Sequence, residues 1–438
     1  MRSQLFRRLF LGLAVIVAVN VTWAPRTRAA DDETNQVLEW NQILIDTLIQ
    51  GNAVNAASPR LSAIVHTAIF DAYNGIEQRY TPIFVAGTAP NGASRRAAVI
   101  AAAYTTLYAL FPSRRTDLDA SYAASLAALS DDEDDTGGQS RERGIAWGVQ
   151  VANAVLAWRA TDGFSSTLVA FRGGTAIGQW RPTPSALASM SSQTLAFTQP
   201  FVLASAMQFR PSAPRGLLSS TYTDDFNAVK NLGRANGSAR TDDQSALAPF
   251  WDGNASVHWN QAANQMARAN HLSMSKTNRL LAVLNIAMAD TMFTTWSGKR
   301  NYGATATDVT WRPVTAITLA DTDSNPETIA DPDWTPLIPT PAHPEYPAGH
   351  PSLNGAGATA LLTCFDDAQT FTLSTRAGGV DLPTRTYSSI SQARSDGNNA
   401  RVWGGMHYPS TVAISNQLGE TIANYVNQHA MQPLHGDR

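Results

Sequence analysis

Two histidines lie seven residues apart in a Pro-rich segment that leads into a predicted helix. His343 and His350 flank the sequence Pro-Glu-Tyr-Pro-Ala-Gly, and the small residues from 353 to 362 are typical of a helix. Pro351 suits the first helical position, because its missing N–H is no loss there. Gly349 and His350 are therefore expected at the helix N-terminus, where free backbone N–H groups and the helix dipole favour a bound anion.

Cationic side chains precede and follow this segment. Lys299 and Arg312 lie upstream, and Arg401 lies downstream with His407 six residues after it. Arginine can hold oxyanion oxygens through two parallel hydrogen bonds, and lysine adds a point charge. Two histidines can supply an axial ligand or nucleophile on one side of such a centre and a proton donor on the other. Taken together, these residues predict a site for a multiply charged oxyanion.

The order of these residues resembles that of the vanadium-dependent haloperoxidases and the type 2 phosphatidic acid phosphatase superfamily. The family pattern is a Lys, then Arg-Pro, then Pro-Ser-Gly-His, then an Arg with a His six residues later. The resemblance covers mainly residues 285–426 and implies an all-α fold, a pair of packed four-helix bundles with long irregular loops. The matching residues here are Lys299, Arg312-Pro313, Pro347-Ala-Gly-His350, Arg401 and His407.

The resemblance also implies a role for each residue. His407 would coordinate the vanadium of a bound vanadate in a haloperoxidase, or attack phosphorus in a phosphatase. His350 would be the acid–base group that deprotonates hydrogen peroxide, and Lys299 would polarise the peroxide for attack by halide. A halide and a small organic acceptor are the other implied partners. The anion's oxygens would be held by Lys299, Arg312, Arg401 and the backbone N–H of Gly349.

Two further residues match the halide pocket of the relatives. Trp296 lies three residues before Lys299. His343 falls where chloroperoxidases of the family tend to carry Phe and bromoperoxidases His, which favours bromide or iodide over chloride. The alternative is that His343 is a loop residue without a role in halide choice.

Three departures from the family pattern affect this interpretation. Ala348 replaces a serine, and the lost hydroxyl hydrogen bond to the anion weakens the site by about 1 to 2 kcal/mol. The gap of twelve residues between Lys299 and Arg312 is longer than usual, so an insertion loop is expected over 300–310, with Arg300 as a substitute for Lys299. Thr411 stands where many members have an Asp that activates the nucleophilic histidine, which counts against phosphatase activity.

The composition fits a large and mainly helical enzyme. The chain has 438 residues, of which 44% are hydrophobic and 15% charged, and a net charge of −3. This is ample for a large core, and no basic patch indicates nucleic-acid binding. Cys364 is the only cysteine, so neither an internal disulfide nor a thiolate metal cluster is expected. His66, His258 and His271 are interpreted as core or surface residues.

The N-terminus has the pattern of an export signal. A basic head is followed by an apolar run of about a dozen residues, too short to span a membrane, and cleavage is predicted near Ala29 or Ala30. Arg7-Arg8-Leu-Phe-Leu favours the twin-arginine route, with an ordinary Sec signal as the alternative. Residues 1–30 are thus predicted to be a signal peptide, and 31–438 a single exported helical domain, periplasmic or secreted, without a stable membrane span. The oligomeric state stays open.

Hydrophobic spacing predicts helices along most of the mature chain. Residues 162–216 and 300–350 are rich in loop signals, the acidic stretch 130–138 is interpreted as a linker with a calcium loop as the alternative, and 370–375 alternates like a short strand. No repeat of fixed period is evident. The predicted helices are 34–50, 58–75, 92–111, 116–129, 139–161, 219–233, 241–249, 255–271, 275–297, 351–364, 387–400 and 410–430.

These observations lead to one main hypothesis and two alternatives. The main hypothesis is an exported vanadium-dependent haloperoxidase that oxidises bromide or iodide with hydrogen peroxide to hypohalous acid. The first alternative is an exported acid phosphatase that uses His407 as nucleophile without a metal, and vanadate would then be an inhibitor. The second is a non-catalytic binding protein for phosphate or a polyanion, which would turn over neither substrate.

Overall fold

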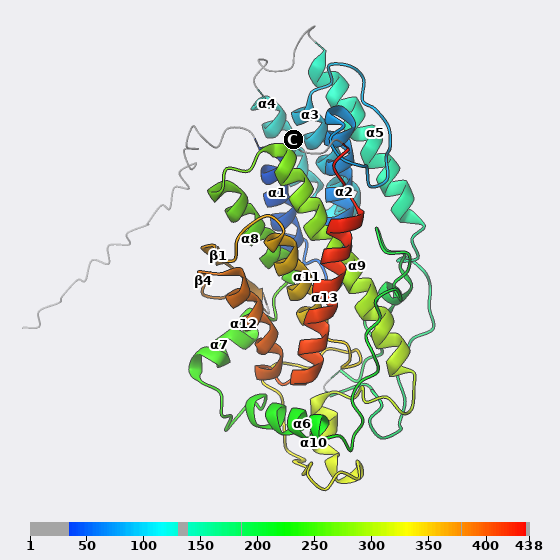
Figure 1. The fold of residues 1–438 in the computed structure, drawn as a ribbon, viewed down its shortest axis with the longest axis vertical. Helices are drawn as coiled ribbons and strands as arrows, with labels where there is room; N and C mark the ends of the chain where they lie inside the picture. The colour runs from blue at the N-terminus through cyan, green and yellow to red at the C-terminus, as the bar shows by residue number, and fades with distance from the viewer. Residues whose placement is uncertain (1–34, 130–138, 185, 378, 435–438) are drawn as a thin grey trace, which may run out of the picture. The chain divides into compact units, whose positions relative to one another are not determined.

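Eight helices form two bundles of four in the part of the chain that the computed structural model describes, residues 35–129, 139–184, 186–377 and 379–434 (Figure 1). At the boundary α2 packs on α9 and α1 on α8. The expected pair of packed four-helix bundles is therefore confirmed. The first bundle comprises α1 (Gln36–Gln50), α2 (Ser58–Glu77), α3 (Arg95–Leu110) and α5 (Ser140–Ala160), and the second α8 (Ala255–Ala269), α9 (Met274–Gly303), α11 (Gly349–Leu362) and α13 (Pro409–His429).

Shorter elements connect the bundles and cover their ends. Strands β1 and β4 pair antiparallel, as do β2 and β3. These elements are α4 (Arg115–Ala127), α6 (Ser220–Leu232), α7 (Asp242–Phe250), α10 (Pro313–Thr318), α12 (Ile390–Trp403), the 3₁₀ helices η2 (Pro112–Arg114), η3 (Gln193–Phe197) and η4 (Ala320–Thr322), and the strands β1 (Phe371–Leu373), β2 (Arg376–Ala377), β3 (Val380–Asp381) and β4 (Arg385–Tyr387).

Every helix expected from the sequence is present, with ends that shift by a few residues. The exceptions are in the region assigned to loops. Helix α9 continues to Gly303, so the expected insertion loop over 300–310 begins only after one more helical turn. Helix α10 was not expected, because six residues are too few to show a helical period. The interpretations of 1–30 and 130–138 concern residues outside the described part of the chain.

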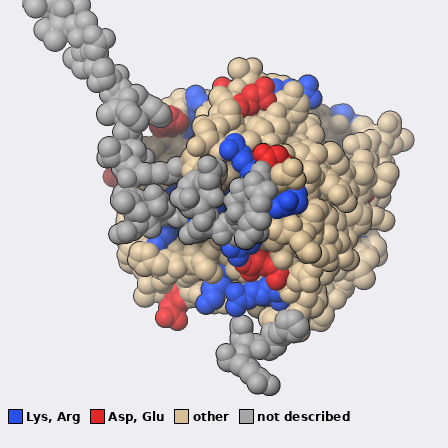
Figure 2. Space-filling view, turned by 90° about the horizontal axis from the view of Figure 1, so that it is seen from above, with Lys and Arg blue, Asp and Glu red and all other residues tan. Residues whose placement is uncertain are grey.

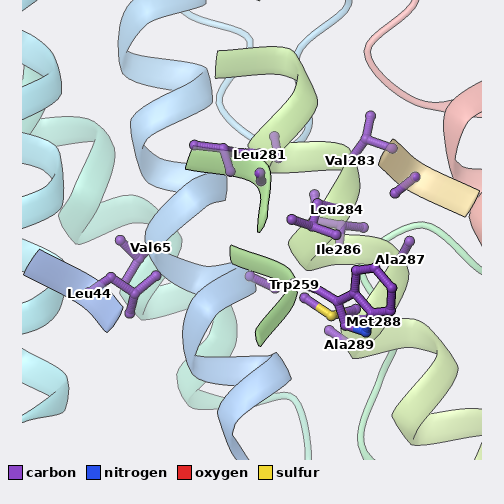
Figure 3. Close-up of a cluster of buried hydrophobic side chains, with 14 of the residues drawn as sticks. Leu44, Val65, Trp259, Leu281, Val283, Leu284, Ile286, Ala287, Met288 and Ala289 are labelled. Carbon is purple, nitrogen blue, oxygen red and sulfur yellow. The ribbon is translucent and has the colours of Figure 1, made fainter. Parts of the chain in front are cut away.

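The core lies around α9, which is buried on all sides over most of its length. Nearly every side chain from Leu280 to Lys299 is buried, and a helix of this kind is expected in the centre of a fold. Figure 3 shows side chains of α9, among them Leu284 and Met288, with Trp259 of α8 in one buried hydrophobic cluster. A well-packed central helix gives Lys299, near its end, a fixed position.

The two bundles carry the same short sequence at the same place. Trp40-Asn41-Gln42 of α1 recurs as Trp259-Asn260-Gln261 of α8. The Asn41 side chain contacts His66 of α2 at 2.9 Å, and that of Asn260 contacts Asn285 of α9 at 2.8 Å, with a separation of 25 residues in both pairs. The bundles are therefore related halves, a repeat that the spacing analysis missed because so few residues stay identical.

The relationship extends to one buried aspartate in each half. Asp71, five residues after His66, accepts hydrogen bonds from the backbone N–H groups of residues 83–85. Asp290, five residues after Asn285, accepts them from residues 201–203. In the second half, this contact ties the long irregular segment 162–216 to the middle of α9, the helix that carries Lys299.

The charged side chains on the surface are distinct from the buried charged side chains that are described below. Figure 2 shows one face, on which Lys and Arg are interspersed with Asp and Glu among a larger area of other residues. In the part of the chain that the structure describes, no helix has both the length and the apolar character needed to cross a bilayer.

Replacing His66 by asparagine, the residue of the second half, is expected to make the protein less sensitive to acid. Burial lowers the pKa of His66 to about 3, so the folded state excludes a proton that the unfolded chain binds below pH 6.5. Stability from this group is therefore present above pH 6.5 and lost as pH falls. At pH 4 the loss is on the order of 3 kcal/mol. Urea unfolding of wild type and His66→Asn at pH 7 and pH 4 measures this loss in the free energy of unfolding. An equal loss in both proteins would contradict the prediction.

Candidate active site

The residues selected from the sequence converge at one end of the second bundle. Lys299 lies near the end of α9, Arg312 caps α10, and Arg401 lies near the end of α12. A cavity of about 250 Å³ opens beside them, and of these three residues only Arg401 lines it. Its walls include Trp296, His343, Gly349, His350, Arg401 and His407.

The turn between α12 and α13 brings Arg401 and His407 together. Gly405 has a φ of +76°, which favours glycine, and a Cβ there would lie 2.5 Å from the carbonyl oxygen of Gly233. The backbone N–H of His407 donates to the carbonyl of Arg401 at 3.3 Å. Pro409 then starts α13 at its first position. The six-residue spacing is thus the length of this closed turn.

Arg312 connects two of the three histidines that line the cavity, His343 and His407. Its Nε donates to the carbonyl of His343 at 2.8 Å, and its Nη2 contacts the same residue's Nδ1 at 2.8 Å. Its Nη1 donates to the carbonyl of Met406 at 2.9 Å and lies 3.1 Å from Nε2 of His407. The guanidinium is therefore fixed in the plane that joins His343 to His407.

Lys299 is completely buried behind the cavity. Its Nζ donates to the carbonyls of Pro344 at 2.6 Å and Glu345 at 3.1 Å. Burial, and next the charge of Arg312, lower the pKa of Lys299 well below its usual value. Arg300, the suggested substitute, instead lies over the ring of Phe171, with 4.1 Å between its Cζ and the ring centroid. Lys299 is thus the lysine or arginine of this helix end that faces the site.

Three buried cations therefore lie near one another, with two carboxylates beside them. The exposed fractions are 0% for Lys299 and Arg312 and 1% for Arg401. Nη1 of Arg401 lies 2.9 Å from the carboxylate of Asp252, and a second carboxylate, Glu345, is buried beside the other two. Buried charges are stable only when they are compensated. The arrangement favours binding of an anion with more than one negative charge.

His350 lies in the first turn of α11 and lines the cavity. Its Nε2 is 3.1 Å from the carbonyl of Gly253, and because a carbonyl only accepts, this nitrogen carries the proton. Burial, and next the charge of Arg401, lower the pKa of His350 to about 4. The ring is therefore neutral at neutral pH, and Nδ1 is free to accept a proton.

Glu345 is a functional residue that the sequence interpretation missed. Its carboxylate is buried, with Oε1 2.8 Å from Nδ1 of His407 and 3.2 Å from the backbone N–H of Tyr408. The hydroxyl of Thr411 donates to Oε2 at 3.0 Å. Burial raises the pKa of Glu345 to about 7. Its position between His343 and His350 was the available signal, but its contact with a residue 62 positions away is visible only in the fold.

The two halide-pocket candidates contact each other. The rings of Trp296 and His343 have centroids 5.1 Å apart. The Trp296 indole N–H donates to the carbonyl of Ser191 at 3.2 Å, so the segment 162–216 helps to hold it. His343 also contacts Arg312, and its role in halide choice stays a prediction.

The start of α11 provides backbone donors but no hydroxyl. Ala348 is the N-cap residue and makes no side-chain cap, while its own N–H donates to the hydroxyl of Ser415 at 2.8 Å. A Cβ on Gly349 would lie 3.3 Å from the ring of Trp296. The first-turn N–H groups of α11 therefore border a cavity that a larger residue at 349 would narrow.

The variant Ala348→Ser is expected to tighten the binding of orthovanadate. A hydroxyl at this position can hydrogen-bond to a bound oxyanion, which is worth about 1 to 2 kcal/mol, or roughly 5- to 30-fold in the dissociation constant. Isothermal titration calorimetry measures the change. Ala348→Gly is the control, because it changes the same residue without adding a hydroxyl. Equal affinities in wild type and Ala348→Ser would show that position 348 does not face the anion.

Comparison with solved structures defines the class of this fold. A bacterial vanadium-dependent iodoperoxidase superposes with a TM-score of 0.75 at 22% sequence identity, covering 92% of this chain and 98% of that one. Holo and apo forms of a bacterial vanadium-dependent chloroperoxidase give TM-scores of 0.64 and 0.65 at 17% and 18% identity, each covering 85% of this chain and 92% of theirs. The chain has the helical fold of these haloperoxidases.

The sequence itself supports the same family at the site. Residues 279–436 match the family model of the VCPO second helical-bundle domain, which spans Lys299, Arg312, His350, Arg401 and His407. The resemblance to the vanadium haloperoxidases is thereby confirmed for this part of the chain. No curated protein sequence matches the chain.

Proposed function

We propose that the protein is an exported vanadate-dependent haloperoxidase. In this reaction hydrogen peroxide, a halide ion and a proton give hypohalous acid and water, and the hypohalous acid then halogenates a small organic acceptor. The observation that carries the proposal is the grouping of three buried cations, Lys299, Arg312 and Arg401, around His407, which lines the cavity. Its place in a haloperoxidase fold supports this choice among oxyanion sites.

The side chains of the site fit a vanadate cofactor. Nε2 of His407 would be the ligand to vanadium, and when bound, vanadate supplies the Lewis acid that makes peroxide electrophilic toward halide. Three buried cations beside only two carboxylates, together with backbone donors, are suited to its negatively charged oxygens. The groups that would hold these oxygens are Lys299, Arg312, Arg401 and the N–H of Gly349.

His350 and Lys299 have separate tasks in this proposal. His350 is neutral above its pKa of about 4, so Nδ1 can take a proton from hydrogen peroxide and return it to the leaving oxygen. Lys299 is fixed by two carbonyl groups and cannot leave the site. Its remaining N–H can draw negative charge away from the oxygen that halide attacks.

Bromide or iodide is the proposed halide. His343 and Trp296 form one wall of a cavity with apolar neighbours, and a weakly hydrated anion loses less solvation there than chloride does. The structural similarity to a bacterial iodoperoxidase also supports this choice of halide. Comparing kcat/KM for chloride, bromide and iodide tests this preference, and the highest value for chloride would contradict it.

An acid phosphatase remains the second candidate, because the structure provides the carboxylate that Thr411 does not. Glu345 contacts Nδ1 of His407 at 2.8 Å, which leaves Nε2 as the nucleophile for an in-line attack on phosphorus. In this alternative, Lys299 and the two arginines stabilise the transferred phosphoryl group. Vanadate would compete with the ester.

A paired assay on the mature protein separates the two functions. Bromide- and iodide-dependent halogenation of a dye is measured with hydrogen peroxide, with and without orthovanadate, beside hydrolysis of a chromogenic phosphate ester. Halogenation that requires orthovanadate is the expected result. Ester hydrolysis that orthovanadate inhibits, without halogenation, would replace the proposal with the phosphatase. Binding of the anions without either reaction would indicate a binding protein.

The proposal of export is supported by residues 1–30. Their basic and apolar pattern is that of a signal peptide. Expression of the full chain, followed by N-terminal sequencing of the protein released from the cell, is expected to give a chain that begins at residue 30 or 31. An uncleaved protein retained in the cell would contradict it.

A further inference from the structure

The two ring nitrogens of His407 have partners of opposite character. The Arg312 guanidinium can only donate, so Nε2 of His407, 3.1 Å from Nη1, acts as an acceptor. Nδ1 lies 2.8 Å from Oε1 of Glu345, a carboxylate oxygen in a different segment of the chain. These contacts agree on one tautomer, with the proton on Nδ1 and the lone pair of Nε2 directed into the cavity.

The carboxylate of Glu345 is itself fixed at both oxygens. Oε1 accepts from the N–H of Tyr408, and Oε2 accepts from the hydroxyl of Thr411. Both donors belong to the beginning of α13, directly after His407. Because Glu345 comes from the loop before α11, it connects the two segments that carry the histidines of the site.

Thr411 is the position at which relatives carry an aspartate, and here its hydroxyl touches the Glu345 carboxylate. A carboxylate at this point beside His407 can therefore be supplied by a side chain at residue 345 or at residue 411. Where those relatives have an aspartate on this helix, the present chain has the longer side chain of Glu345, which comes from the loop before α11. Thr411 then has the smaller task of donating one hydrogen bond to that acid.

We propose that Glu345 is the positioning residue of His407, holding the imidazole with Nε2 toward the oxyanion in place of an acid at residue 411. This proposal rests on the proposed function in one respect only, which is that the bound oxyanion is vanadate. Partners that fix a ligating histidine typically affect metal affinity 10- to 100-fold. Without Glu345 the imidazole is held through Nε2 alone, by the same arginine that the anion requires.

The first test measures the tautomer and does not depend on the reaction. In protein labelled with ¹⁵N-histidine, two-bond ¹⁵N–¹H correlations distinguish a proton on Nδ1 from one on Nε2, and the His407 signal is the one missing in His407→Gln. A neutral ring protonated on Nδ1 is expected. A ring protonated on Nε2 would overturn the proposal, whether or not the protein is a haloperoxidase.

The second test measures orthovanadate affinity by calorimetry in a set of matched variants. Glu345→Gln keeps the shape of the side chain and is expected to weaken binding 10- to 100-fold. Asp225→Asn is the control. Asp225 of α6 is another largely buried carboxylate, and it accepts a hydrogen bond from Ser410 at the start of α13 but has no bond to His407. It is expected to bind orthovanadate as wild type does. Thermal unfolding confirms that both variants are folded.

The double variant Glu345→Gln, Thr411→Asp returns a carboxylate to the helix. It is expected to recover most of the affinity lost in Glu345→Gln, which a purely structural role of Glu345 would not produce. No recovery, or an equal loss in Asp225→Asn, would overturn the proposal. If wild type does not bind orthovanadate at all, the proposed function fails, while the tautomer measurement still decides the role of Glu345.

Discussion

The variant His407→Ala is expected to lose orthovanadate-dependent halogenation, with turnover reduced on the order of a thousandfold or more. The imidazole provides the neutral lone pair of Nε2 beside the three cations, and alanine leaves no ligand for vanadium in its place. Orthovanadate binding should weaken strongly at the same time, since charge attraction alone would remain. Steady-state kinetics with saturating bromide and peroxide, and calorimetry with orthovanadate, measure the two losses.

The fold should survive this substitution. Arg312 keeps its hydrogen bonds to the carbonyls of His343 and Met406, and Glu345 keeps those from Tyr408 and Thr411. A control is His271→Ala, which removes an exposed histidine at the start of the turn before α9 and should leave activity unchanged. Full halogenation by a folded His407→Ala protein would exclude His407 as the vanadium ligand.

The order of the charged residues predicted side chains that the fold brings together, because each of them follows a local signal. Pro351 marked the start of α11, and Arg401 and His407 are separated by one closed turn. Lys299 seemed displaced by a long gap, yet α9 continues past it and keeps it buried. A count of residues between motifs cannot distinguish a longer loop from a longer helix.

What the sequence could not provide were contacts between distant segments. Glu345 reaches His407 over 62 positions, and Ser191 holds Trp296 over 105. The repeat of the two bundles was also hidden, since its strongest trace is three identical residues and one buried aspartate in each half. Such positions are set by packing across the fold, and no local pattern of hydrophobicity reports them.

The same contacts show how the irregular segment 162–216 serves the site. Its backbone is tied to Asp290 in the middle of α9 and to Trp296 two turns later. Segments without regular structure have unpaired backbone groups that need such partners. The segment therefore forms a fixed wall of the cavity, and the buried aspartate of the repeat acts here as its anchor.

The variant Lys299→Met is expected to lower halogenation by about 100- to 1000-fold while the protein stays at least as stable as wild type. Methionine has a similar length and keeps the packing of α9, but it removes the charge that stabilises the oxygens of the bound anion. Lys276→Met is the control, because it changes an exposed lysine at the start of the same helix.

The stability effect follows from the lowered pKa of Lys299. The unfolded chain binds a proton at this lysine below about pH 10.5. In the folded state, protonation of Lys299 is disfavoured by burial and by the nearby charges of Arg312 and Arg401. The group therefore destabilises the anion-free protein increasingly as pH falls below that value, and the destabilisation is complete below the folded-state pKa. Removing the lysine should raise the Tm measured at neutral pH in the absence of anions.

Anion binding reverses this balance, because a bound oxyanion favours the protonated lysine. Orthovanadate should therefore bind wild type with uptake of a proton, and its affinity should fall as pH rises, more steeply in wild type than in Lys299→Met. Calorimetry in buffers of different ionisation enthalpy measures the proton uptake. Equal uptake in both proteins, together with a lower Tm for Lys299→Met, would mean that Lys299 is a structural cation and that the anion is held by the arginines and His407 alone.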